Sequence, residues 1–159
     1  MGNRVTVLKS IAYDEWELGQ TYLSPGLTMS LSVVEQYGRA LSSPNTGLCY
    51  NAAEQWEGLV PTGLILEVAT RIEPAALWFD GCFIQFLSQQ MTFSSPVYLN
   101  DTIRLAMTPV AKRASDLLDC GAIDFHIALL NQRGETVADG VWSILVSNCP
   151  EQWWPALRE

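Results

Sequence analysis

Residues 123–146 read IDFHIALLNQRGETVADGVWSILV, and this stretch decides the fold class. Its first part alternates between apolar and polar positions, with the apolar ones being Ile123, Phe125, Ile127 and Leu129. Such an alternation is typical of a strand with one buried face, which leaves His126 on the outer, solvated face. Residues 131–134, Asn-Gln-Arg-Gly, predict a hairpin turn. The return strand over 136–147 places Trp142, Ile144 and Val146 on one face. The stretch therefore predicts an antiparallel hairpin.

Two further strands are expected before this hairpin, over residues 82–93 and 102–111. A helix is expected earlier, over residues 32–41, because Ser32 and Glu35 fit a capping box. Its apolar face comprises Val33, Val34, Tyr37, Ala40 and Leu41.

A second helix is expected over residues 61–73, with proline in its first turn and Pro74 limiting its extent. Its buried face comprises Leu64, Ile65, Val68 and Ile72. Helices followed by a run of antiparallel strands predict an α+β fold.

The composition excludes several classes of protein. A length of 159 residues, 48% hydrophobic and 16% charged, suits one domain over 1–159 with a sizeable core. A net charge of −8 would repel nucleic acid. No apolar run reaches the roughly 18 residues of a membrane span. Residues 1–16 are too polar for a secretory signal, so we expect a cytoplasmic protein without a membrane segment.

The cysteines are Cys49, Cys82, Cys120 and Cys149, and they form no C-x-x-C pair. Together with one histidine, they give no pattern of zinc ligands, so we expect neither a metal nor another cofactor. We expect each cysteine of such a chain to be reduced and to serve as a small residue buried in the core.

Five stretches over roughly residues 10–147 resemble the MaoC-like family of hot-dog hydratases and dehydratases. They are YDEWELGQTYLSPGLTMS at 13–30, RALSSPNTGLCYN at 39–51, LVPTGLILEVATRI at 59–72, FSSPVYLNDTIRL at 93–105, and IALLNQRGETVADGVWSILV at 127–146. The resemblance implies a hot-dog fold, in which a curved antiparallel sheet wraps a long central helix. It also implies a substrate that is an acyl thioester of coenzyme A or of acyl carrier protein.

The family hydrates trans-2-enoyl thioesters with an Asp and a His five residues apart, in A-L-S-G-D-x-N-P-x-H-x-D. Aligned without a gap, the Asp falls on Pro44 and the His on Cys49, while the Asn falls on Thr46 and the last Asp on Asn51. Proline has no side-chain proton acceptor, and a thiol is not an imidazole base. Gly63 matches the glycine whose backbone N–H polarises the thioester carbonyl, so the resemblance implies a retained carbonyl site without the hydratase pair.

We therefore expect the old active-site pocket to remain in use, with Cys49, Asn51 and Gly63 as its catalytic residues. Cys49 is either a nucleophile or a small apolar lining residue. Asn45 and Asn51 either orient a carbonyl or serve as turn residues. The expected substrate-binding residues are Asn45, Tyr50, Thr62 and Trp56. The other aromatic residues near the second helix, Trp78, Phe79, Phe83 and Phe86, are expected mostly in the core.

Three functions remain open. The first is a divergent enzyme of the lyase, isomerase or cyclase type, acting on an acyl-thioester or polyketide-like hydrophobic substrate. The second is a non-catalytic acyl-binding subunit of a heteromeric MaoC-like dehydratase. The third is a residual enoyl-thioester hydratase. In each case, we expect a homodimer or a heterodimer with a related hot-dog subunit, because a single sheet leaves edge strands unpaired.

Overall fold

The computed structural model describes residues 4–5, 10–41, 58–75, 78–115 and 119–148. The side chains of residues 37–41 and 72–75 lie outside this description, so the predicted burial of Tyr37, Ala40, Leu41 and Ile72 stays a prediction. The elements in chain order are β1 (Arg4–Val5), η1 (Tyr13–Glu15), β2 (Thr21–Leu23), β3 (Leu27–Thr28), α1 (Leu31–Leu41), α3 (Thr62–Ala75), β4 (Phe83–Phe93), β5 (Thr102–Ala114), β6 (Cys120–Leu130) and β7 (Thr136–Ser147).

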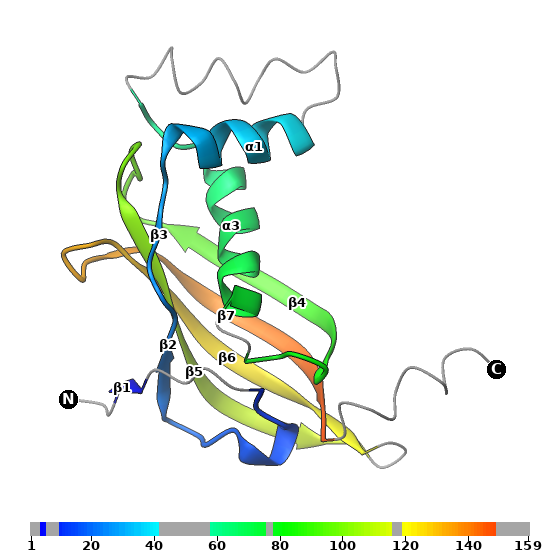
Figure 1. Cartoon of the computed structure of the whole chain (residues 1–159). Helices are drawn as coiled ribbons and strands as arrows, with labels where there is room; N and C mark the ends of the chain where they lie inside the picture. The colour runs from blue at the N-terminus through cyan, green and yellow to red at the C-terminus, as the bar shows by residue number, and fades with distance from the viewer. Residues whose placement is uncertain (1–3, 6–9, 42–57, 76–77, 116–118, 149–159) are drawn as a thin grey trace.

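The strands form one sheet in the order β1-β2-β5-β6-β7-β4, and β3 also pairs with β5. All the pairings are antiparallel except that of β1 with β2. Figure 1 shows α3 lying along one face of this sheet, with α1 crossing near the N-terminal end of α3. The predicted α+β arrangement of a long helix on an antiparallel sheet is confirmed.

The hairpin β6–β7 forms the centre of the sheet as the alternation predicted. Phe125 pairs with Trp142 and Ile123 with Ile144, and all four side chains are fully buried against the helix side. The turn closes as the N–H of Gly134 donates to the carbonyl of Asn131 at 2.9 Å. Gly134 has a φ of 79°, which glycine adopts without a steric penalty. His126 is exposed on the opposite face, so its predicted position is confirmed.

The start of α1 differs from the capping box expected at Ser32. The helix begins at Leu31, and the N–H of Val33 donates to the Oγ of Ser30 at 3.4 Å. Ser30 is therefore the capping residue, because its carbonyl also accepts the first helical bond, from the N–H of Val34 at 3.0 Å. The expected inward side of the helix is confirmed at Val34, which is buried.

The central helix α3 buries Leu64, Ile65 and Val68, as its spacing predicted. It ends at Ala75, so Pro74 lies within its last turn. A proline near the C-terminal end of a helix removes the hydrogen bond of its own N–H but does not prevent one more residue from adopting helical angles.

The aromatic residues near the second helix divide between the core and the edge strand β4. Trp78 and Phe79 are buried in the core, as expected. Phe83 is 41% exposed and Phe86 is half-buried, because both lie on β4, the last strand in the sheet order. The short elements β1, β2, β3 and η1 were not predicted, since two or three residues give no readable period.

Candidate functional site

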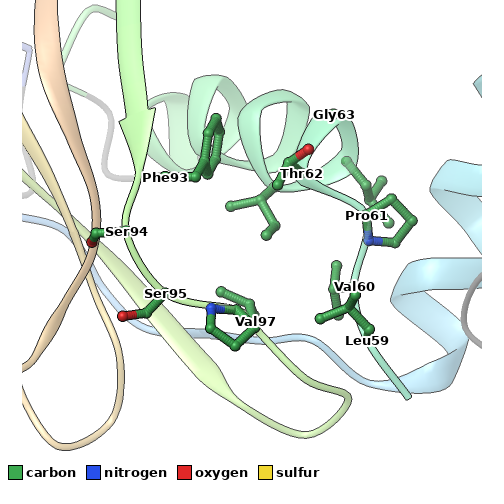
Figure 2. A pocket seen from close by; sticks show the side chains of 12 residues that line it. Leu59, Val60, Pro61, Thr62, Gly63, Phe93, Ser94, Ser95 and Val97 are labelled. Carbon is green, nitrogen blue, oxygen red and sulfur yellow. The ribbon is translucent and has the colours of Figure 1, made fainter. Parts of the chain in front are cut away.

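A cleft of about 730 Å³ opens at the N-terminal end of α3. One wall is the first turn of α3 with the residues before it, and the other is the segment that follows β4. Figure 2 shows Pro61, Thr62 and Gly63 on one side of the hollow, with Ser94, Ser95 and Val97 across it. We refer to this hollow as the α3 cleft. Its lining residues are Leu59, Val60, Pro61, Thr62, Gly63, Leu64, Ile65, Phe93, Ser94, Ser95, Pro96 and Val97.

Backbone hydrogen bonds hold the two walls of the α3 cleft together at its base. The N–H of Val60 donates to the carbonyl of Val97 at 2.8 Å, and the N–H of Leu99 donates to the carbonyl of Gly58 at 2.7 Å. The N–H groups of Ser94 and Ser95 both donate to the carbonyl of Val137 on β7, at 3.0 and 3.2 Å. The cleft is therefore anchored both to the helix and to the sheet.

The first turn of α3 has two backbone N–H groups for which the described residues supply no acceptor. The N–H groups of Leu64 and Ile65 donate to the carbonyl of Pro61, at 3.0 and 3.1 Å. Those of Thr62 and Gly63 have no acceptor within the described part of the chain, as expected at the start of a helix. A side-chain carbon built onto Gly63 would meet no atom within 4 Å. The cleft therefore offers open space, two N–H donors without an acceptor in the described part of the chain, and the positive end of the helix dipole.

The described lining of the α3 cleft suits polarisation of a carbonyl group rather than proton transfer. None of its described lining residues carries a carboxylate, imidazole, amine, guanidinium, thiol or phenol group. Two serines and one threonine are the only side chains there with polar atoms. N–H donors at a helix N-terminus can stabilise negative charge developing on a carbonyl oxygen. The described residues can thus bind an apolar molecule and polarise its carbonyl group.

Gly63 and Thr62 are the predicted site residues that the structure places in the cleft. The other predicted residues, Cys49, Asn51, Asn45, Tyr50 and Trp56, lie outside the described residues, as do Pro44 and Thr46. The contribution of residues 93–97 was missed. The stretch FSSPV was recognised as family-like, but no property of its sequence shows that it faces the start of α3.

The carboxylate of Asp124, whose pKa is clearly lowered, is not part of the α3 cleft lining. On the outer face of the sheet, Arg113 donates from both Nη atoms to Asp124, with Nη2 to Oδ1 at 2.7 Å. The Oγ of Ser143 donates to the same carboxylate at 2.6 Å. Hydrogen bonding to Arg113, with a smaller effect of Ser143, lowers the pKa of Asp124 to about 2. Because its charge is already compensated, this carboxylate is a structural group.

The described cysteines behave as small core residues. Cys82 and Cys120 are both reduced and buried, as predicted, and burial raises the pKa of the Cys120 thiol. Burial also raises the pKa of Tyr13, beside which the Nζ of Lys112 lies 4.5 Å from the ring centre. Cys49 and Cys149 lie outside the described residues. No group of three potential metal ligands occurs among the residues with described positions.

The fold is similar to those of solved hydratases and dehydratases. R-hydratase PhaJ1 from Pseudomonas aeruginosa is 19% identical, with 88% of each chain covered and a TM-score of 0.69. A MaoC-like dehydratase from Rhodospirillum rubrum is 15% identical, with 89% of this chain and 99% of that one covered and a TM-score of 0.71. A Mycobacterium tuberculosis protein with a double hot-dog fold is 18% identical, with a TM-score of 0.70 over 89% of this chain and 46% of its own.

No family model matches the sequence, and no curated protein matches it either. The structural likeness nevertheless confirms that the chain has the hot-dog fold found in MaoC-like dehydratases. At these identities, the likeness concerns the fold. Among the described helices, none combines the length and the apolar character required to cross a membrane.

Proposed function

We propose that this chain is a divergent MaoC-like enzyme that binds a hydrophobic acyl-thioester or polyketide-like substrate in the α3 cleft. The reaction is of the lyase, isomerase or cyclase type and proceeds without the hydratase Asp/His pair. The observation that carries the proposal is the apolar cleft of about 730 Å³ lined by Thr62 and Gly63, whose N–H groups have no acceptor among the described residues.

These two N–H groups would stabilise the negative charge that develops on the carbonyl oxygen in all three reaction types. Hydrogen bonds to a carbonyl oxygen stabilise the negative charge that develops there when a neighbouring C–H bond loses its proton. Removing one such donor from an enzyme typically costs about 10²–10³-fold in turnover. The apolar walls would exclude water from this carbonyl and so strengthen the interaction.

The proton acceptor would come from outside the described lining. From the alignment, we propose Cys49 and Asn51 as the residues that face the substrate, with Asn45, Tyr50 and Trp56 beside them. Exchange of His and Asp for Cys and Asn makes a site roomier and removes its charge. A neutral, roomier site favours a bulky apolar substrate held by shape.

A second candidate is a non-catalytic acyl-binding subunit paired with an active hot-dog partner. The absence of any ionisable side chain from the described cleft lining favours this reading. In either case, we propose that residues 1–159 form one hot-dog domain and that two such chains form a dimer. The dimer is proposed because β4 is an 11-residue strand with no partner on its outer side among the described strands.

Turnover of short thioesters separates these functions. The purified chain would be incubated with the N-acetylcysteamine thioesters of trans-2-octenoic, 3-hydroxyoctanoic and 3-ketooctanoic acid, and products would be followed by NMR. We expect conversion of at least one of them, and no hydration of crotonyl-CoA near the ~10 s⁻¹ of a median enzyme. Binding without any conversion would support the subunit function, whereas fast hydration would restore the hydratase function.

A bulky side chain at position 49 locates the site. Cys49→Phe should abolish the conversion while the melting temperature stays nearly unchanged. Leu18→Phe is the matched control, because Leu18 is exposed and lies outside the cleft lining. Unchanged turnover in the Cys49→Phe protein would contradict the proposed position of the site.

A further inference from the structure

The first half of β4 exposes apolar side chains at one end of the sheet. Residues 83–87 read FIQFL, in which Phe83 and Leu87 are 41% and 47% exposed, while Ile84 and Phe86 are half-buried. The middle of the strand, SQQ at 88–90, is exposed and polar. We refer to residues 83–87 as the β4 apolar end. An exposed apolar stretch on an edge strand is an association hazard that proteins usually cover.

The ring of Phe83 is the outermost member of an aromatic row that runs into the core. Its centroid lies 5.2 Å from that of Phe86, and the Phe86 centroid lies 5.5 Å from that of the buried Trp142. The ring of Phe79 lies 6.2 Å from Phe83, and all three pairs meet edge to face. A further ring packed on Phe83 would add a contact of the same kind and remove apolar surface from water. The β4 apolar end therefore suits an aromatic occupant.

The chain leaves the sheet beside this surface. Phe83 pairs with Val146, near the end of β7. Figure 1 shows the end of β7 and the start of β4 at the same end of the sheet. Asn148, which follows β7, is fixed in place because its N–H donates to the carbonyl of Asp119 at 3.0 Å. The segment after Asn148 therefore starts from a defined point close to the β4 apolar end.

This segment carries two tryptophans. Residues 149–159 read CPEQWWPALRE, with Trp153 and Trp154 at their centre, and they lie outside the described residues. Asn148 is two positions beyond Val146 and one strand away from Phe83, which corresponds to a separation of roughly 8 Å. The stretch from Asn148 to Trp153 spans up to about 17 Å when it is extended. Both tryptophans are therefore within reach of Phe83.

We propose that Trp153 and Trp154 pack onto the β4 apolar end of their own chain and cover the ring of Phe83. A short tether gives the tryptophans a high effective concentration at this surface, which favours their own chain over a second copy. Side chains stand out of the plane of a sheet, whereas strand pairing uses backbone groups within that plane. The contact is therefore compatible with the dimer proposed through the β4 edge, and it does not depend on the proposed reaction.

Removal of the two indole rings from the full chain tests the contact. Trp153→Ala combined with Trp154→Ala should lower the melting temperature by about 4 °C or more, because aromatic contacts and buried apolar surface are lost. Binding of the dye ANS should increase as apolar surface becomes exposed. Trp153→Phe combined with Trp154→Phe keeps two rings and should recover at least half of the loss. Glu151→Ala is the matched control in the same segment and should change the melting temperature by less than about 2 °C.

A double-mutant cycle locates the contact. In a Phe83→Ala background, the two Trp→Ala substitutions should cost at most half as many degrees as in the wild type, because their packing partner is already absent. Tyr98→Ala provides the control background, since Tyr98 is also aromatic and is 47% exposed, but follows the opposite end of β4. In that background, the two substitutions should cost as much as in the wild type. Differential scanning calorimetry measures all of these melting temperatures.

The results decide between the possible occupants of the β4 apolar end. An unchanged melting temperature after both Trp→Ala substitutions would overturn the proposal and leave this surface to a second copy or to another protein. An equally large loss in the Phe83→Ala background would also overturn it, because the tryptophans would then pack elsewhere. Coupling to Phe83 that disappears on dilution from tens of micromolar to tens of nanomolar would place them on a second copy and contradict the assignment to their own chain. Coupling that persists on dilution would support the proposal.

Discussion

Gly63→Ala separates the stability of the fold from the function of the α3 cleft. Gly63 is the second residue of α3, and its φ is not among the positive glycine angles of the described chain. An added methyl group would meet no atom within 4 Å. Alanine at a helical position without strain stabilises a protein by about 0.4–1 kcal/mol, chiefly by restricting the unfolded chain. For a chain of this size, we expect a rise in melting temperature of roughly 1–4 °C.

The same methyl group should damage binding, because Gly63 lines the cleft and the added carbon would take up open space beside it. It would stand beside the N–H groups of Thr62 and Gly63 and push a carbonyl oxygen beyond hydrogen-bond distance. The expected loss is about tenfold or more in affinity for octanoyl-N-acetylcysteamine, and about 10²-fold in any turnover that depends on these donors. Calorimetry measures the affinity, and differential scanning calorimetry measures the melting temperature.

Thr70→Ala is the matched control for this substitution. It also places alanine in α3, but at a position whose hydroxyl donates to the carbonyl of Glu67 at 2.8 Å and does not line the cleft. Its stability should change by less than about 1 kcal/mol, with ligand affinity unchanged. If Gly63→Ala melts higher and yet binds and turns over ligand like the wild type, the start of α3 is not the site.

Two further predictions concern the sheet. Light scattering at micromolar concentration should give twice the monomer mass of 17.6 kDa, and a wild-type mass near 17.6 kDa would count against the proposed dimer. Leu87→Lys should shift the protein toward the monomer, because Leu87 is 47% exposed on the edge strand β4. Asp124→Asn should lower the free energy of unfolding by about 1 kcal/mol at pH 7, a value discounted for the exposure of Arg113. Since folding lowers the pKa of Asp124 from 3.8 to about 2, its contribution is complete above about pH 5 and is lost progressively as the pH falls through 2. Urea unfolding of both proteins at pH 7 and at about pH 1.5 measures this loss, and an undiminished difference at the lower pH would contradict the assignment.

Long elements with a clear period were accessible from the sequence. The alternation in 123–130 predicted both the strand and the fully buried side of β6, because successive side chains of a strand point to opposite faces. The spacing of Leu64, Ile65 and Val68 likewise predicted the buried face of α3. Elements of two or three residues, such as β1 and β3, carry no period and appeared only in the structure.

Gly140 shows a constraint that no local pattern carries. A side chain there would collide with the carbonyl of Gln90 on β4, fifty residues earlier in the chain. The requirement for glycine therefore arises from the pairing of β4 with β7. Likewise, the partial exposure of Phe83 depends on β4 being at the end of the strand order, which its own apolar sequence does not indicate.

The candidate site likewise has features that the sequence predicted and features that only the tertiary structure showed. By itself, the sequence predicted the α+β class and the hot-dog fold. The exchange of the family's Asp and His for Pro44 and Cys49 and a catalytic role for Gly63 stay predictions from the alignment. Only the tertiary structure decided that residues 93–97 form the opposite wall of the α3 cleft and that the described lining carries no ionisable group. Periodicity reports which side of an element is buried, whereas a cleft depends on which distant segments the sheet and helix bring together.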